Sequence, residues 1–175
     1  MSAIQQSQAS TGILIGVRQQ GKPAVLLQVR AEHDSYPGAC QVTTHGKLTE
    51  DELRLDKSDA LATAIGRKLR DELGSVAAEM VEAALSSPVD LEEFVNSKGR
   101  LVVTRGIDLG IEASAFAKLI VRGKDVGGFR PCTDPNTIQP LEDAHKKEGV
   151  PAKETRMFED EIKAVKEFFR RVFNS

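Results

Sequence analysis

Arg67-Lys68-Leu69-Arg70-Asp71-Glu72-Leu73-Gly74 is the stretch that decides the fold. It ends a predicted helix whose apolar residues recur at helical spacing and form one face: Leu61, Ala64, Ile65 and Leu69. Ser58 or Asp59 is suited to cap the start of this helix, and glycine is the favoured residue just after a last turn. The sequence therefore predicts a helix with a cluster of charged residues directly before its end.

Apolar runs before this helix predict strands. Residues 12–17 and 24–30 are separated by a turn that contains Gly21 and Pro23, so they are expected to pair as a β-hairpin. Pro37 and Gly38 mark a loop at 34–38. Residues 40–44 are rich enough in β-branched side chains for another short strand.

After this helix, the sequence predicts a second helix at 76–85 and a hairpin of strands at 91–95 and 100–107. Residues 112–120 are predicted as a helix in preference to a strand, and 127–141 as mostly irregular. An amphipathic helix at 158–173 follows. Strands on both sides of a helix, without regular βα alternation, indicate a mixed α/β fold. A length of 175 residues with 40% hydrophobic residues fits one domain, at 12–175, behind a Gln/Ser/Ala-rich mobile tail at 1–11.

A second charged segment, Gly46-Lys47-Leu48-Thr49-Glu50-Asp51-Glu52, precedes the helix. With residues 67–74 it resembles the Nudix box, G-x5-E-x7-R-E-U-x-E-E-x-G-U, where U is a bulky aliphatic residue. Gly46 and Glu52 have the G-x5-E spacing, and the second half is matched, with Asp allowed for Glu, by Arg67, Leu69, Asp71, Glu72 and Gly74. The Leu-Leu-Gln-x-Arg run at 26–30 is similar to the strand that often precedes the box, so the resemblance covers about residues 12–74.

The resemblance implies a Nudix-type α/β/α sandwich with a mixed sheet. It also implies a metal-dependent hydrolase of a nucleoside diphosphate linked to another group, or of a related small diphosphate. Catalytic roles would fall to Glu52, Arg67 and Glu72, with the arginine orienting the carboxylates. Asp71 and Glu72, with Glu52 beside them, would hold Mg²⁺ or Mn²⁺, hard cations that prefer oxygen ligands. Gly46 would let its loop approach the substrate.

Departures from the pattern keep a second hypothesis open. Lys68 stands where the pattern has a metal-facing glutamate, and it shares a helix face with Glu72, four residues further on. An ammonium there repels a divalent ion or instead contacts a substrate phosphate. Residues 53–66, 14 in number, separate the two halves where the pattern has seven, and Ser75 replaces the final aliphatic residue. We therefore expect an enzyme, and keep as the alternative a catalytically impaired Nudix-fold module that senses a nucleotide or binds a protein.

The same residues also have plainer interpretations. Asp71 and Glu72 are typical of a solvated helix face, and Arg67 with Asp71 fits an exposed ion pair at i, i+4. His45 beside the motif glycine is weak as a lone metal ligand. Acidic residues near the start of the last helix favour its dipole: Glu154, Glu159, Asp160 and Glu161. The distant acidic residue that often completes Nudix sites lies outside the box and is not assigned.

Composition limits the classes of binding partner that the sequence predicts. A net charge of −2 and scattered basic residues give no sign of nucleic-acid polymer binding. No apolar run approaches the roughly 20 residues of a membrane span, and the N-terminus is unlike a signal peptide. Cys40 and Cys132 read as two reduced thiols. We expect a cytoplasmic protein with a small-molecule diphosphate as its partner; because Nudix proteins are commonly dimers, a homodimer stays open.

Overall fold

A mixed seven-stranded sheet forms the middle layer of the computed structural model, which describes residues 9–95, 99–142 and 155–173. The strands are β1 (Ala9–Gln19), β2 (Lys22–Arg30), β3 (Cys40–Gln41), β4 (Thr44–Lys47), β5 (Val89–Val95), β6 (Leu101–Glu112) and β7 (Val126–Cys132). β1 runs parallel to β6 and antiparallel to β2 and β4. Two further short strands, β8 (Gln139–Pro140) and β9 (Arg156–Met157), pair in parallel beside it.

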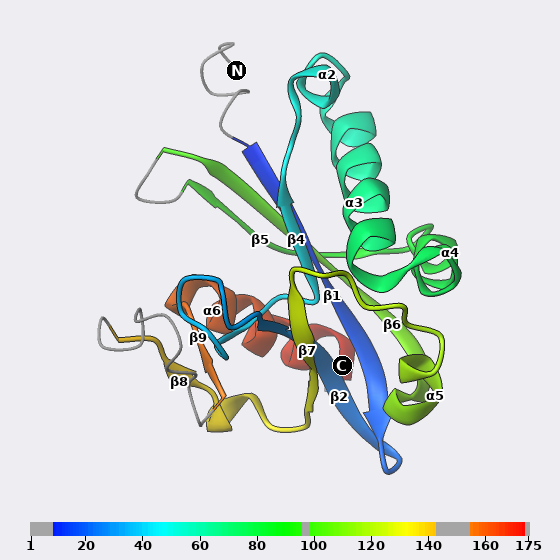
Figure 1. The fold of residues 1–175 in the computed structure, drawn as a ribbon, viewed down its shortest axis with the longest axis vertical. Coiled ribbons are helices and arrows are strands. Elements are labelled where there is room, and N and C mark those ends of the chain that lie inside the picture. The colour runs from blue at the N-terminus through cyan, green and yellow to red at the C-terminus, as the bar shows by residue number, and fades with distance from the viewer. Residues whose placement is uncertain (1–8, 96–98, 143–154, 174–175) are drawn as a thin grey trace.

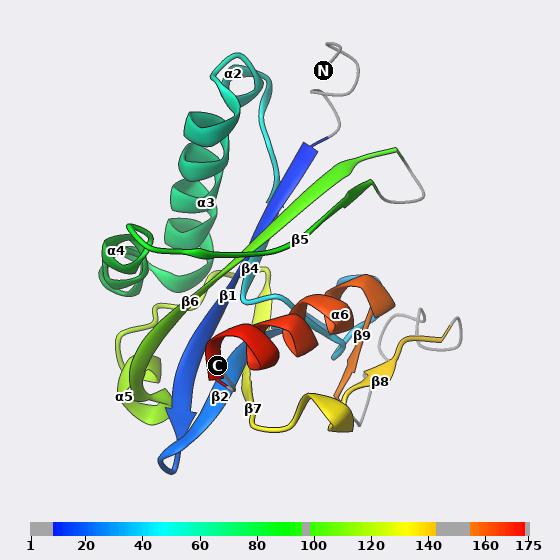
Figure 2. The ribbon, with the colours of Figure 1, turned by 180° about the vertical axis from the view of Figure 1, so that it is seen from behind.

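Helices cover both faces of this sheet. They are α2 (Glu50–Leu53), α3 (Lys57–Leu73), α4 (Ser75–Ala84), α5 (Ala113–Ala117) and α6 (Glu159–Phe168), which continues into a π-helical turn at Phe169–Phe173. α3 and α4 lie against one face (Figure 1), and α6 crosses the other (Figure 2). None of the described helices is long and apolar enough to cross a membrane. The predicted α/β/α sandwich with a mixed sheet is confirmed.

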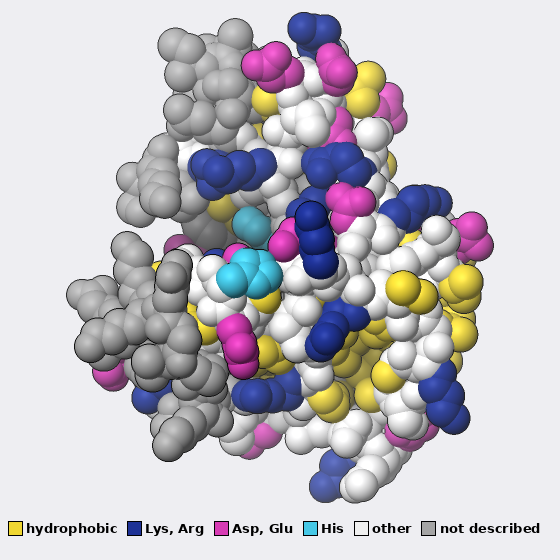
Figure 3. Space-filling view, viewed as in Figure 1, with side chains coloured by type: hydrophobic (Ala, Val, Ile, Leu, Met, Phe, Trp, Pro, Cys, Tyr) yellow, Lys and Arg dark blue, Asp and Glu magenta, His cyan; other side chains and the backbone are white. Residues whose placement is uncertain are grey.

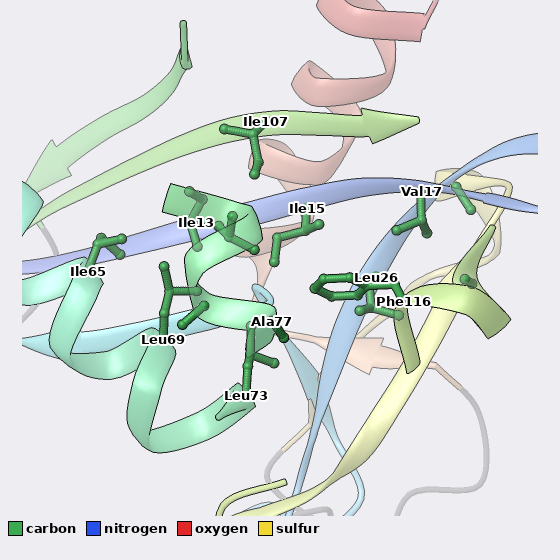
Figure 4. Close-up of a cluster of buried hydrophobic side chains, with 14 residues drawn as sticks. Ile13, Ile15, Val17, Leu26, Ile65, Leu69, Leu73, Ala77, Ile107 and Phe116 are labelled. Carbon is green, nitrogen blue, oxygen red and sulfur yellow. The ribbon is translucent and has the colours of Figure 1, made fainter. Parts of the chain in front are cut away.

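Alternation along β1 divides the core between the two faces. Successive strand residues point to opposite sides of a sheet. Ile13, Ile15 and Val17 are fully buried toward α3, α4 and α5 (Figure 4), whereas Leu14 is buried in the cluster beneath α6. Phe116 of α5 is also fully buried in the first cluster. Because both faces of β1 are covered, its middle reads as a continuous apolar run.

The partners of β1 change halfway along the strand. Residues Ser10–Ile13 pair with β4, and Ile15–Gln19 pair with β2. At this fork the Ile15 amide donates to the Thr43 hydroxyl at 3.0 Å, and that hydroxyl donates in turn to the Leu26 carbonyl. Thr43 therefore bridges Ile15 and Leu26, which face each other where the β1–β2 pairing begins, and it ties the chain just before β4 to the middle of β2.

The structure confirms the predicted helix that carries the motif, but a different residue caps its start. The side chain of Asp56, rather than Ser58 or Asp59, caps α3 by accepting the Asp59 amide at 3.0 Å. Gly74 ends α3 with a φ of 81°, as predicted for a residue just beyond a last turn. The long spacing within the motif is taken up by additional helical turns at 57–66. The predicted helix at 112–120 is shorter than expected, because β6 continues to Glu112.

The prediction that 127–141 is mostly irregular was wrong for its first part. β7 pairs antiparallel with β2, with Pro131 opposite Leu26. A proline is tolerated there because β7 pairs with no other described strand, and edge strands can lack a ladder donor. The strand predicted at 40–44 is split into β3 and β4. The hairpin of β5 and β6 is confirmed, although its turn at 96–98 lies outside the described residues, as does most of the predicted tail.

Candidate functional site

A cleft of 460 Å³ opens where the end of α3 meets β2, the 40–45 segment and the loop that follows α5. Its lining is polar and carries both signs of charge. Figure 3 shows Lys, Arg, Asp, Glu and His side chains gathered over this part of the molecule. The fork in the sheet places His45 and Gln41 on one wall, and α3 places Lys68, Asp71 and Glu72 on the other.

A directional chain of hydrogen bonds crosses the cleft. Arg30 donates to the Gln41 side-chain carbonyl at 2.9 Å; the Gln41 amide donates to Gln28, and the Gln28 amide donates to Glu72. A guanidinium only donates and a carboxylate only accepts, so the two ends fix the orientation of both amides. Glu72 is thereby held in place from β2 and β3, not only from its own helix.

Lys68 closes the chain at the Glu72 end. Its Nζ lies 3.4 Å from Oε1 of Glu72, one helical turn away. The aliphatic part of Lys68 lies directly over Gly46, where an added Cβ would come within 2.7 Å of the lysine carbons. Gly46 was expected to admit a substrate, but the space beside it is filled by this lysine.

Burial changes the protonation of two groups in the cleft. It raises the pKa of Glu72 to about 7, although the Lys68 ammonium and the Gln28 amide favour the charged form. It lowers the pKa of His45 to about 4, with Lys68 adding to the effect, so this imidazole is neutral at physiological pH. Lys68 therefore faces a buried carboxyl group in a cleft that Arg30 also lines.

The loop after α5 completes the rim. The amides of Val121 and Gly123 donate to the carbonyls of Leu73 and Glu72, at 2.8 and 3.2 Å. A Cβ on Gly123 would lie 2.3 Å from the Asp71 carbonyl oxygen, so only glycine permits this approach. The loop presents Lys124 and Asp125 to the cleft.

Glu52 and Arg67 form a separate structural unit beside the cleft. Arg67 donates to both carboxylate oxygens of Glu52, at 2.9 and 3.1 Å, and to the Lys47 carbonyl at 3.0 Å. Glu52 also accepts the Thr49 amide at 2.7 Å and forms a capping box with that residue. The hydrogen bonds from Arg67 hold the pKa of Glu52 below its usual range. This unit ties the motif loop to α3.

The structure brings only part of the predicted site together. Lys68, Asp71 and Glu72 line the cleft, whereas Gly46, Glu52 and Arg67 are not among its lining residues. Residues that sequence reasoning did not assign to the site are Gln28, Arg30, Gln41 and Lys124. The Gln-x-Arg run in the strand before the motif was one available signal, since a polar residue within a buried strand needs a partner. Glu161, expected only to favour the dipole of the last helix, is half-buried, and its carboxylate accepts the Val42 amide at 3.2 Å.

The donors do not fit the divalent ion that the resemblance implies. Within the described residues, no group of three or more His, Cys, Asp or Glu side chains is arranged to hold a metal. Both oxygens of Glu72 already accept protein donors, one of them a cation, and Asp71 is exposed. Mg²⁺ and Mn²⁺ need several free oxygen ligands, which these side chains do not provide together. The metal roles of Asp71 and Glu72 remain predictions.

Solved structures share this fold. No protein-family model matches the sequence, and no curated protein is similar to it. A bifunctional NMN adenylyltransferase/ADP ribose pyrophosphatase from Francisella tularensis has a TM-score of 0.56 at 15% identity, over 97% of this chain and 42% of that one. DR0079 from Deinococcus radiodurans has a TM-score of 0.50 at 16% identity, over 75% and 69%. The NUDIX domain of Shewanella oneidensis NrtR, complexed with ADP ribose, has a TM-score of 0.49 at 14% identity, over 73% of each chain.

The architecture and the partial motif on α3 define the class: the chain has the Nudix fold. At 15–16% identity, the two likenesses with TM-scores of 0.50 and 0.56 establish that fold, and the chemistry has to come from the chain's own residues.

Proposed function

We propose that the cleft binds a small molecule that carries a phosphate or diphosphate group. One observation carries the proposal: the cations Arg30 and Lys68 both line the cleft, and Glu72 is the one carboxyl group among its described lining residues that is buried. Asp34, Asp71 and Asp125 add negative charge, but Asp71 and Asp125 are exposed and screened by water and salt, and Asp34 and Asp125 lie within 4.0 and 3.3 Å of His33. The two cations therefore favour an anion in the cleft.

Arg30 is already held in position for such a ligand. Its guanidinium donates to the Ser35 carbonyl and hydroxyl and to Gln41. An arginine has five N–H donors, and these three bonds leave two for a ligand. A guanidinium fixed in advance binds a phosphate as a fork, at little entropic cost.

Ligand binding measured by calorimetry tests the proposal. AMP and ADP-ribose are suitable probes, because fold neighbours are an ADP ribose pyrophosphatase complexed with AMP and a NUDIX domain complexed with ADP ribose. We expect Arg30→Met to weaken binding by about tenfold or more, which is about 1.4 kcal/mol. The matched control is Lys166→Glu on α6, an exposed position on the opposite face of the sheet. Equal affinities of the wild type and a folded Arg30→Met variant would place the ligand elsewhere.

Hydrolysis of the bound ligand is the second candidate. The observation that favours it is Glu72, a carboxyl group at the cleft whose pKa of about 7 suits proton transfer near neutral pH. The test is release of phosphate or pyrophosphate from nucleoside triphosphates, nucleotide sugars, ADP-ribose and dinucleoside polyphosphates, with Mg²⁺ or Mn²⁺ and with chelator. Turnover that disappears in the Asp71→Asn/Glu72→Gln double variant would establish an enzyme. If folded protein that binds ADP-ribose releases no phosphate or pyrophosphate from any of these compounds, the non-catalytic binding module is supported instead.

A further inference from the structure

Lys68 lines the cleft beside the buried carboxyl group of Glu72. Its Nζ is 3.4 Å from Glu72, and 27% of its side chain is exposed, so the ammonium is still accessible to a ligand. The lysine stem is confined by Gly46, because a Cβ at that position would overlap three of its carbons. The ammonium is therefore directed to the carboxyl group and the cleft by the shape of β4 and not only by charge.

Each carboxylate oxygen of Glu72 already has a donor from the protein. Lys68 engages one oxygen, and Gln28 donates to the other. Gln28 cannot turn its carbonyl toward Glu72 without breaking the chain through Gln41 to Arg30. A carboxylate compensated on both oxygens has little to offer a divalent ion, and the adjacent ammonium repels one.

We infer that Lys68 takes the place of a divalent cation in this cleft, so that the protein binds a phosphate-bearing ligand without a metal. The inference rests on the proposed function, since it concerns how the same cleft neutralises its ligand. The ammonium contacts a phosphate oxygen while its partner carboxyl group stays hydrogen-bonded to Gln28. Arg30 contacts the ligand from the opposite wall with its two remaining N–H groups.

Calorimetric titration of ADP-ribose in EDTA and in millimolar Mg²⁺ tests this inference. The wild type is expected to bind equally well, within about twofold, in both conditions. Lys68→Met should lose about tenfold or more in EDTA and recover nothing in Mg²⁺, whereas Lys68→Arg should retain most of the affinity. Lys68→Glu should bind poorly in EDTA and regain affinity in Mg²⁺, because the new carboxylate supplies a metal ligand. The control is Lys166→Glu, which makes the same charge change on the opposite face and should behave as wild type.

The outcomes separate the two proposals. Wild-type binding that requires Mg²⁺, or a Lys68→Met variant that binds as tightly as wild type in EDTA, overturns the inference and leaves the ligand site in place. Failure of ADP-ribose and AMP to bind wild type in either condition overturns the proposed function and the inference together. A direct titration of Mg²⁺ gives an independent readout: heat of binding is expected for Lys68→Glu and none for wild type. Thermal melts establish that each variant is folded, and Lys68→Met decides the question if Lys68→Glu does not fold.

Discussion

Replacing Glu52 with glutamine tests whether this carboxylate stabilises the fold or takes part in ligand binding in the cleft. Glu52 is 5% exposed and accepts three hydrogen bonds, two from Arg67 and one from the Thr49 amide. The pair joins α2, and through the Lys47 carbonyl the end of β4, to the middle of α3. Glutamine has the same shape but no charge, and its amide nitrogen places one donor opposite the donors of Arg67.

The expected destabilisation follows from these contacts. Hydrogen bonds to charged groups contribute about 1.5–3 kcal/mol each; one of the two bonds from Arg67 is lost outright, while the other now joins the guanidinium to a neutral carbonyl. The arginine is 36% exposed, so water compensates part of the loss. We expect Glu52→Gln to lower the free energy of unfolding by about 2–3 kcal/mol. For a chain of this size that lowers Tm by roughly 4–12 °C.

The pH dependence has a definite sign. Arg67 lowers the pKa of Glu52, so the pair's contribution is present above the unfolded pKa of about 4.3 and is lost as pH falls through the lower folded value. The difference in Tm between wild type and Glu52→Gln should therefore shrink below about pH 4.

Thermal and urea unfolding at pH 7 give the first measurement, with Glu50→Gln as the control. Glu50 is exposed on the same short helix, so its replacement should change stability by less than about 0.5 kcal/mol. The folded Glu52→Gln protein should bind ADP-ribose within about twofold of wild type. A variant with wild-type stability and lost ligand binding would refute this account and place Glu52 in the site, as the motif alone suggested.

Two further predictions concern other parts of the fold. Burial raises the pKa of Glu161 to about 7, so this group lowers stability as pH rises from about 4.3 to about 7. Glu161→Gln keeps an acceptor for the Val42 amide, and it should raise Tm at pH 8 and leave Tm unchanged at pH 4. An equal shift in Tm at both pH values would contradict the prediction. Gly123→Ala should lower the free energy of unfolding by more than about 2 kcal/mol and weaken ligand binding, because the methyl group meets the Asp71 backbone. Gly66→Ala within α3, where the new methyl group meets only the flexible end of a side chain, should be neutral or stabilise the protein by up to about 1 kcal/mol. Similar losses of stability for both variants would show that the close contact of the Gly123 loop with Asp71 is not what limits the substitution.

Local patterns determined the elements of this fold. The hairpin of β1 and β2, the helix α3 and the end of that helix at Gly74 were predictable from the sequence. Each is encoded by residues that are close in sequence: two apolar runs, one amphipathic face and one glycine. The partial motif extended this to the layered sandwich. β7 was not predicted because the prolines of the 127–141 segment, one of them Pro131 within the strand, suggested a loop; only its pairing with β2 makes it a strand.

The sequence by itself placed Lys68, Asp71 and Glu72 on one helix and supplied the contrast between Lys68 and the expected glutamate. Only the tertiary structure decided what surrounds them. Gln28 donates to Glu72 directly and Arg30 is linked to it through Gln41 and Gln28, and these contacts join residues from β2, β3 and α3 that no spacing rule connects. The sequence likewise could not show that Glu52 is engaged by Arg67, because a carboxylate in a motif looks the same whether it faces a ligand or a guanidinium. Periodicity encodes contacts along one element, whereas a cleft forms between elements, and its charge balance depends on which side chains the packing brings within hydrogen-bond reach.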